Sequence, residues 1–372
     1  MSKAPPGPAL VGCPVCGLTQ TIGAVPAGSA AYCARCGKTL RHGGSEPGQA
    51  AFCFALGALL LFLPAYRWPI LEVTTFGRSH SYTVLSGIEA LWQAAMWPLA
   101  IPVALASVVL PAGLILVLLA LSAARHMGGG QAALRPWNRL CDLLRTWAIV
   151  DVYLLAIFVT VVKLAQLADA APAVGAALFL AMVLCLTLAL RALDGAGAAL
   201  EPGSAPAAGS LDRTFALALG ALILFVPANI FPTLTVTTHG STEGATVADG
   251  VVDLWQAGMW PLALIVLCAS LLIPFFKIIG LMFLTLSIES TSHQRARTRL
   301  YLFIAQIGRW SMLDVYVISL IVAVLHFGAL AEGHADVGSL AFVSVVIVTI
   351  MAARSFDPRL IWAPAPDQRR GA

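Results

Sequence analysis

The sequence predicts an all-α integral membrane protein that consists of two parallel-repeat four-helix transmembrane units (eight helices), small β-hairpins and one N-terminal cysteine-rich ribbon. Three observations support this fold class. Hydrophobic residues make up 59% of the 372 positions and charged residues only 11%, whereas about a quarter of the residues in a soluble domain are charged. Eight apolar stretches are long enough to cross a membrane, and the two halves of the chain repeat each other.

The apolar stretches are expected to form membrane helices, because a bilayer core about 30 Å thick needs roughly 20 apolar residues per helix. They cover residues 50–66, 98–124, 146–167, 171–190, 214–230, 261–288, 300–327 and 339–351. The first is expected to be a retained anchor, since about fifty residues with a cysteine motif precede it. With the N-terminus inside, Lys and Arg collect in the inner loops, at positions such as 125–139 and 295–299, so both termini are predicted to be cytoplasmic.

A constant offset of 163 residues aligns the two halves without a gap from Leu61 to Asp194. The matching segments are Leu-Phe-x-Pro-Ala at 61–65 and 224–228, Leu-Trp-Gln-Ala at 91–94 and 254–257, Met-Trp-Pro-Leu-Ala at 96–100 and 259–263, and Asp-Val-Tyr at 151–153 and 314–316. Each unit has an even number of spans, so both copies have the same orientation. The halves are therefore expected to pack about a pseudo-two-fold axis along the membrane normal.

Each unit also carries an outer segment between its first and second spans. Residues 69–84 and 232–247 contain β-forming residues around a glycine and predict small hairpins. Helical spacing of apolar residues from Ile88 to Met96 predicts an interfacial helix next, either a plain membrane anchor or a docking surface. The expected organisation is a cytoplasmic ribbon and tail (1–48), a first membrane unit (49–194), a cytoplasmic linker (195–212), a second membrane unit (213–357) and a cytoplasmic tail (358–372).

Two Cys-x-x-Cys motifs near the N-terminus predict a structural zinc site. Cys13 and Cys16 are separated from Cys33 and Cys36 by sixteen residues, and a glycine follows each pair. This spacing is typical of a four-cysteine tetrahedral Zn²⁺ site, which stabilises a segment too small to form its own core. Disulfide or redox chemistry and an iron site are the alternatives, and a reducing cytosol disfavours disulfides. The second unit has no equivalent motif. Cys53 and the remaining cysteines are expected to be packed thiols.

Ionisable residues inside membrane helices are candidate functional residues, because they are costly to bury in lipid. Lys277 lies in the second span of the second unit, and Asp314 in the third span is its expected partner. Helical spacing extends the pair to a polar network with Ser270, Ser311 and Thr349, whereas the first unit has Leu114 in place of the lysine. Asp151 and Arg309 are secondary candidates. A buried ion pair that only fixes helix register, a proton or substrate relay, and a misassigned membrane depth all remain open.

The motifs taken together resemble those of the paraquat-inducible protein A (PqiA/LetA) family. They are the Cys-x-x-Cys pair, Val-Pro-Ala-Asn-Ile-Phe-Pro at 226–232, Met-Trp-Pro-Leu-Ala at 259–263, Pro274 with Lys277, Gly-Arg-Trp-Ser-Met-Leu-Asp-Val-Tyr at 308–316 and Phe-Asp-Pro-Arg-Leu-Ile-Trp at 356–362. The resemblance implies a bacterial inner-membrane protein with periplasmic hairpins. It also implies phospholipid transport between the inner and outer membranes with a periplasmic MCE-family tunnel protein. Family members commonly carry a ribbon before each unit, and this chain lacks the second.

Three function classes follow from these expectations. The first is a lipid-transfer subunit of an MCE-type system, in which the pair of Lys277 and Asp314 couples proton movement to conformational change. The second is a secondary transporter or efflux protein for amphipathic solutes. The third is a structural membrane anchor for a periplasmic tunnel protein. An enzyme is not expected, because no nucleophile elbow, HExxH motif or phosphate loop occurs, and nothing points to nucleic-acid binding.

Overall fold

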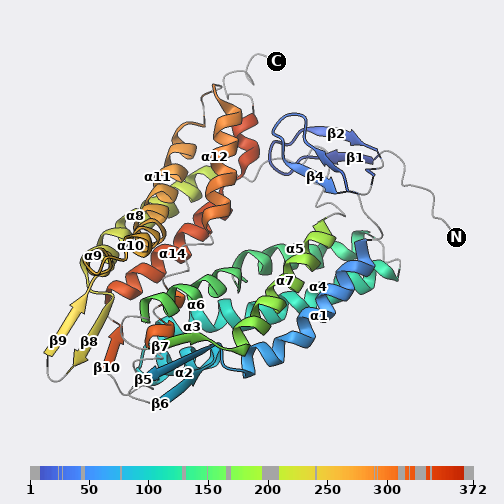
Figure 1. Ribbon diagram of the computed structural model, residues 1–372. Coiled ribbons are helices and arrows are strands. Elements are labelled where there is room, and N and C mark those ends of the chain that lie inside the picture. The colour runs from blue at the N-terminus through green and yellow to red at the C-terminus, as the bar shows by residue number, and fades with distance from the viewer. Residues whose placement is uncertain are drawn as a thin grey trace.

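The computed structural model describes residues 9–23, 25–26, 28–42, 47–75, 78–127, 131–148, 150–164, 169–194, 209–238, 241–288, 290, 292–308, 315–317, 319–322, 332–335 and 337–363. Helices dominate the described chain, in agreement with the predicted class. The two halves form two groups of helices that come together near the sheets and spread apart toward the N-terminal ribbon (Figure 1). Small β-sheets lie at one end of both groups, and the N-terminal ribbon lies at the other end.

The first half begins directly after the ribbon. Its elements are α1 (Pro47–Arg67), β5 (Leu71–Thr75), β6 (Arg78–Tyr82), α2 (Val84–Gln93), α3 (Trp97–Ala104), η1 (Leu105–Val109), α4 (Leu110–His126), α5 (Gln131–Trp147), α6 (Val150–Leu164), β7 (Asp169–Pro172) and α7 (Val174–Asp194). Helix α1 packs between α4 and α7. Small residues of α1, such as Ala51, Ala55 and Ala58, are fully buried and allow this close approach.

The second half repeats this order of elements. They are α8 (Ser210–Ile230), β8 (Leu234–Thr238), β9 (Ser241–Ala245), α9 (Val247–Gln256), α10 (Trp260–Val266), η2 (Leu267–Leu272), α11 (Ile273–Leu286), α12 (Gln294–Ile307), β10 (Glu332–Ala335), α14 (Val337–Ser355) and η4 (Pro358–Trp362). Residues 315–317 and 319–322 are also helical. Helix α8 packs against α11 and α14, as α1 does against α4 and α7.

Seven helices of the described chain are long and apolar enough to cross a membrane. They cover Gly48–Arg67, Trp97–His126, Leu134–Val161, Val174–Leu193, Ser210–Ile230, Ala263–Leu286 and Val337–Ser355. The remaining predicted span, 300–327, includes residues 309–314 and 323–327, which lie outside the described residues. These seven helices make the chain a multi-pass membrane protein. The count of eight spans in two four-helix units stays a prediction.

Both predicted hairpins are confirmed, and each is part of a three-stranded sheet that the sequence did not predict. Strands β5 and β6 pair antiparallel, as do β8 and β9. Strand β7 then pairs with β5, and β10 pairs with β8, each from a segment just before the last helix of its half. The third strand covers the free edge of the hairpin, whose backbone N–H and C=O groups would otherwise lack partners.

The two basic segments that the sequence placed in connections between spans are largely helical. Arg135 and Arg139 lie in α5, and Arg295, Arg297 and Arg299 lie in α12. In α5 the basic residues alternate with apolar ones at helical spacing, so that Leu134, Cys141 and Leu144 pack against α4 while the charges face outward. Composition alone suggested a loop, whereas the spacing of the apolar residues favours an amphipathic helix.

The second span of each half contains a π-helical turn, η1 or η2, immediately before a helix that has proline at its second position, Pro111 or Pro274. Proline has no N–H and cannot donate to the carbonyl four residues earlier, which is that of Ser107 in the first half. The hydroxyl of Tyr66 donates to the Ser107 carbonyl instead. Both π-turns replace what the sequence predicted to be regular helix.

Candidate functional site

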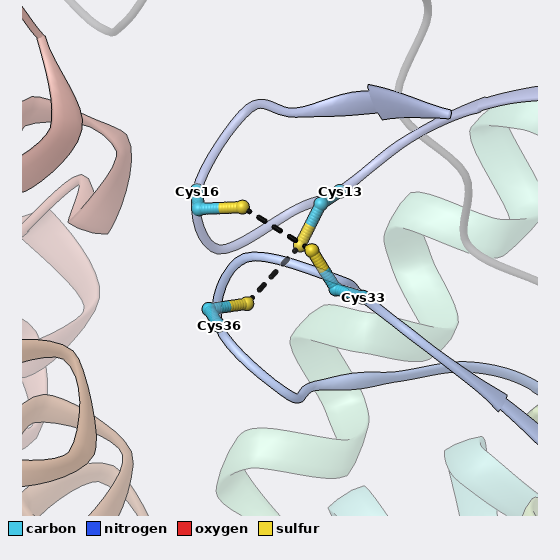
Figure 2. Close-up of side chains that lie close together, drawn as sticks. All are labelled: Cys13, Cys16, Cys33 and Cys36. Atoms are coloured by element: carbon cyan, nitrogen blue, oxygen red, sulfur yellow. Dashed lines mark hydrogen bonds between the residues drawn. The ribbon is translucent and has the colours of Figure 1, made fainter. Parts of the chain in front are cut away.

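The four cysteines of the N-terminal motifs form one cluster at the meeting point of two hairpins. Strands β1 (Ala9–Gly12) and β2 (Thr19–Ile22) flank the first pair, and β3 (Ala30–Tyr32) and β4 (Thr39–His42) flank the second. Figure 2 shows the four side chains pointing toward a common centre. Their sulfur atoms all lie within 4.8 Å of one another.

The backbone of each pair folds into a tight knuckle. The N–H of Gly17 donates to the Cys13 carbonyl at 2.9 Å, and the N–H of Gly37 donates to the Cys33 carbonyl at the same distance. Both glycines have positive φ angles, +70° and +75°, which only glycine adopts without strain. Glycine at these two positions therefore lets the backbone reverse after each cysteine pair, so that both thiols of a pair face the same point.

The sulfur positions fit a tetrahedral metal better than disulfides. Cys13 Sγ lies 3.6 Å from Cys36 Sγ, and Cys16 Sγ lies 3.4 Å from Cys33 Sγ. A disulfide requires about 2.05 Å. Tetrahedral zinc with bonds of about 2.3 Å separates its sulfur ligands by about 3.8 Å. All four cysteines are free thiols, and the cluster could hold one ion.

Burial makes two of these thiols, those of Cys16 and Cys36, hard to ionise. It raises the pKa of the Cys16 thiol well above its ordinary value and that of Cys36 to about 11. For Cys33 burial acts in the same direction, but hydrogen bonds from the backbone N–H groups of Cys36 and Arg35 outweigh it and lower the pKa. A metal must therefore displace protons from the buried thiols when it binds.

The other cysteines are less buried than the sequence suggested. Cys53 on α1 is exposed, and Cys141, Cys185 and Cys268 are partly buried. The prediction of packed thiols is wrong for Cys53, because it lies on the face of α1 that points away from α4 and α7. A membrane helix carries apolar residues on all sides, so composition does not show which face is packed.

The second candidate site surrounds Lys277 on α11, whose side chain is only 3% exposed. Its ammonium Nζ donates to the hydroxyl of Thr349 on α14 at 3.1 Å, and the same hydroxyl donates to the Val346 carbonyl at 2.9 Å. A Cβ atom on Gly308 would lie 3.0 Å from Nζ, so the lysine fills the space beside this glycine. The structure thus joins three helices, α11, α12 and α14, around one amine.

The remaining residues of the predicted network are placed only in part. Ser270 is fully buried in the π-turn η2, and its hydroxyl has no partner within the described part of the chain. Asp314, Ser311 and Arg309 lie outside the described residues, so the expected pair of Lys277 and Asp314 stays a prediction. In the first half Leu114 and Leu186 occupy the positions of Lys277 and Thr349, and both are buried. Apolar side chains therefore replace the polar ones at both positions.

A third cluster of polar side chains lies between the two halves, and sequence reasoning did not identify it. Tyr153 of α6 and Tyr316 are both fully buried, and their ring centroids are 4.9 Å apart. Neither hydroxyl has a hydrogen-bonding partner among the described residues. The repeated Asp-Val-Tyr motif was the sequence feature that could have indicated this tyrosine pair. A repeat does not by itself show that its two copies are in contact.

Comparison with known proteins agrees with the motifs. Residues 49–197 and 211–365 each match the sequence profile described as paraquat-inducible protein A. Intermembrane transport protein PqiA of Escherichia coli is 35% identical over 161 residues, which cover 42% of this chain. This alignment spans only 38% of the length of PqiA.

A second relative aligns over most of the chain. Lipophilic envelope-spanning tunnel protein A of Escherichia coli is 28% identical over an alignment 392 positions long, which covers 94% of this chain and 90% of that protein. A probable intermembrane transport protein of Haemophilus influenzae is 28% identical over 154 residues, 41% of this chain and 37% of that protein. No solved structure matches this chain.

Proposed function

Since the chain belongs to the paraquat-inducible protein A family, we propose that it is the inner-membrane subunit of an MCE-type system that moves phospholipids between the inner and outer membranes. Relatives that carry the words intermembrane transport and envelope-spanning tunnel in their names support a transport role. The periplasmic partner in this proposal is an MCE-family tunnel protein. Both termini and the ribbon lie on the cytoplasmic side, and the two three-stranded sheets lie on the periplasmic side.

One observation supports active coupling rather than a passive anchor. Lys277 is an amine buried among apolar helices, and its contact with Thr349 is made in one half of the repeat only. A purely architectural lysine would be costly, because an amine in a membrane interior requires desolvation and paired partners. We therefore assign Lys277, Thr349, Ser270, Ser311 and Asp314 to a polar centre whose protonation changes with the conformation of the second half.

The four-cysteine cluster is proposed to hold a structural Zn²⁺. The donor set of four thiols is typical of zinc or iron sites, and the sulfur separations of 3.4 and 3.6 Å are close to those of tetrahedral coordination. Four protein ligands leave no open position for a substrate. The ion would fix the fold of the ribbon, and no step of lipid transfer passes through it.

Lys277→Met tests the transport proposal, and Leu114→Met is its matched control at the equivalent position of the first half. Each protein is co-expressed with its tunnel partner, purified and assayed for bound phospholipid and for lipid transfer between labelled vesicles. We expect Lys277→Met to remain folded and partner-bound while transfer falls at least tenfold, and Leu114→Met to retain transfer.

Two results distinguish the other function classes. Full transfer by Lys277→Met would contradict a coupling role and favour a structural anchor. A protein that binds no tunnel partner and no phospholipid, but exports an amphipathic cation from vesicles, would identify a secondary transporter instead.

A further inference from the structure

The N-terminal ribbon packs on the second half, although the chain connects it to the first half. The ribbon core around Cys13, Cys16 and Cys33 contacts Leu302 of α12 and Trp362 of η4. Figure 1 shows the ribbon beside α12, at the end of the molecule opposite the sheets. The ribbon therefore bridges the two halves at this end.

Arg35, inside the second cysteine motif, makes the central contact. Its guanidinium carbon lies 5.4 Å from the centroid of the Trp362 ring, which is a cation–π geometry. The same guanidinium donates to the Cys16 carbonyl at 3.5 Å. Arg35 thus connects both cysteine motifs to the indole of Trp362.

The first knuckle makes a second contact with the same segment. A Cβ atom on Gly17 would lie 3.8 Å from the Arg359 side chain, so the turn of the knuckle lies against that side chain. Arg359 forms an ion pair with Asp357 at 2.6 Å. Both knuckles therefore present residues adjacent to a cysteine ligand to η4.

The segment that receives the ribbon is itself tied to the second half. The indole N–H of Trp362 donates to the Thr298 hydroxyl of α12 at 2.9 Å. The N–H of Asp357 donates to the hydroxyl of Ser210 at the start of α8, also at 2.9 Å. A displacement of η4 would therefore disturb the ends of both α8 and α12.

The repeat shows that this receiving segment belongs to one half only. Residues 356–362 read Phe-Asp-Pro-Arg-Leu-Ile-Trp, whereas the aligned residues 193–199 read Leu-Asp-Gly-Ala-Gly-Ala-Ala. The chain has one ribbon and one copy of the segment that it contacts. One ribbon and one receiving segment are expected if the segment's role is to bind the ribbon.

We propose that the ribbon is a metal-dependent clasp, which links the first half to the second by docking its two cysteine knuckles on Pro358–Trp362. The described part of the ribbon has six buried apolar residues, and three of them are cysteine ligands, so without a metal little holds Gly17 and Arg35 in their docking positions. Loss of the metal would release η4. This inference depends on the metal site and not on lipid transport.

Hydrogen exchange of the full-length protein in detergent tests the clasp. The reporter is the peptide that covers residues 358–363, where Leu360 N–H donates to Asp357 and Ala363 N–H donates to Leu360. Removal of the metal with a chelator, verified by elemental analysis, is expected to raise the exchange rate of this peptide at least tenfold. Added Zn²⁺ is expected to restore the slow rate. Unchanged exchange in the metal-free protein would overturn the proposal.

Arg35→Ala tests the contact without touching a ligand, and Lys38→Ala, an exposed residue of the same motif region, is its control. We expect Arg35→Ala to keep its metal and to exchange several-fold faster at 358–363, while Lys38→Ala matches the wild type. If metal removal also raises the exchange rates of α1 and α8, the protein unfolds as a whole. The exchange rate of Arg35→Ala at residues 358–363 then decides whether the ribbon docks on this segment. Wild-type exchange in Arg35→Ala with its metal retained would refute docking through Trp362.

Discussion

Tyr153 and Tyr316 occupy equivalent positions in the two halves and pack edge-to-face, with their rings inclined at 70°. Both are fully buried in the hydrophobic core shared by the two halves. A second contact lies nearby, where a Cβ atom on Gly87 of α2 would lie 2.8 Å from the Ser319 hydroxyl. Around the equivalent Gly250, no atom of the described residues lies within 4 Å of the Cβ position. The interface between the halves therefore combines a symmetric tyrosine pair with a one-sided contact.

Tyr316→Phe and Tyr316→Ala test this interface. The hydroxyl of Tyr316 has no partner among the described residues, so its removal is expected to leave stability unchanged or slightly higher. Truncation to alanine leaves a cavity and is expected to cost about 3–5 kcal/mol. Thermal melting of the detergent-purified proteins measures both. Equal losses in the two variants would show that the hydroxyl has a partner outside the described residues.

Gly175→Ala and Gly338→Ala test the close approach of the last helix of each half to the segment before the sheet. A Cβ atom at 175 would lie 2.5 Å from the Trp68 carbonyl, and one at 338 would lie 2.5 Å from the Pro232 carbonyl. The backbone must shift to admit it, so each variant is expected to lose about 1–3 kcal/mol of stability. Heating followed by size-exclusion chromatography gives the melting midpoint.

Gly220→Ala is the matched control, because its Cβ position in α8 has no atom within 4 Å in the part of the chain that the structure describes. Its melting midpoint is expected to equal or exceed that of the wild type, since alanine favours a helix by roughly 0.5–1 kcal/mol over glycine. Wild-type midpoints for Gly175→Ala and Gly338→Ala would contradict the tight packing at both helix starts.

Thr349→Val and Thr349→Ser test the polar centre. Valine has nearly the shape of threonine but cannot accept the hydrogen bond of the Lys277 amine, whereas serine can. Leaving the buried amine without this acceptor is expected to cost about 1–3 kcal/mol. Lipid transfer is expected to fall about tenfold or more in Thr349→Val and to survive in Thr349→Ser. Normal transfer by both variants, at wild-type membrane levels, would remove Thr349 from the mechanism.

Cys13→Ser and Cys36→Ser test the metal site against Cys53→Ser, whose side chain lies on the exposed face of α1. A four-thiolate site loses most of its affinity when one ligand is replaced, because the remaining ligands no longer complete the tetrahedron. Elemental analysis is expected to find about one zinc per wild-type and Cys53→Ser chain, and less than a tenth of that in the other two variants. Iron in place of zinc, or disulfides detected by mass, would contradict the assignment.

Much of the fold was predictable because its signals are local. The apolar stretches, the hairpin segments and the paired cysteines are each read from fewer than about thirty consecutive residues, and each reports a single element. The start of α3 and α10 at Trp97 and Trp260 also follows the motif directly. Lys277 and Thr349, which helical spacing assigned to one network, are joined by a hydrogen bond in the structure.

The remaining features depend on contacts between distant segments. A third strand joins each sheet because it pairs with a free edge formed by residues about a hundred positions away. The π-turn in the first half is stabilised by Tyr66 of another helix. Neither the third strand nor the π-turn is marked by a periodic pattern in its own part of the sequence.

The sequence by itself determined that this chain is a duplicated membrane protein with a four-thiol ribbon, because hydrophobic length, an internal offset and cysteine spacing are properties of the chain alone. Only the tertiary structure decided what the duplicated parts do differently: Lys277 meets Thr349 in one half, and the ribbon contacts Trp362 of the second half, more than 300 residues further along the chain. The physical reason is that equivalent segments share their local preferences. Which surface each one buries depends on side chains supplied by the rest of the fold.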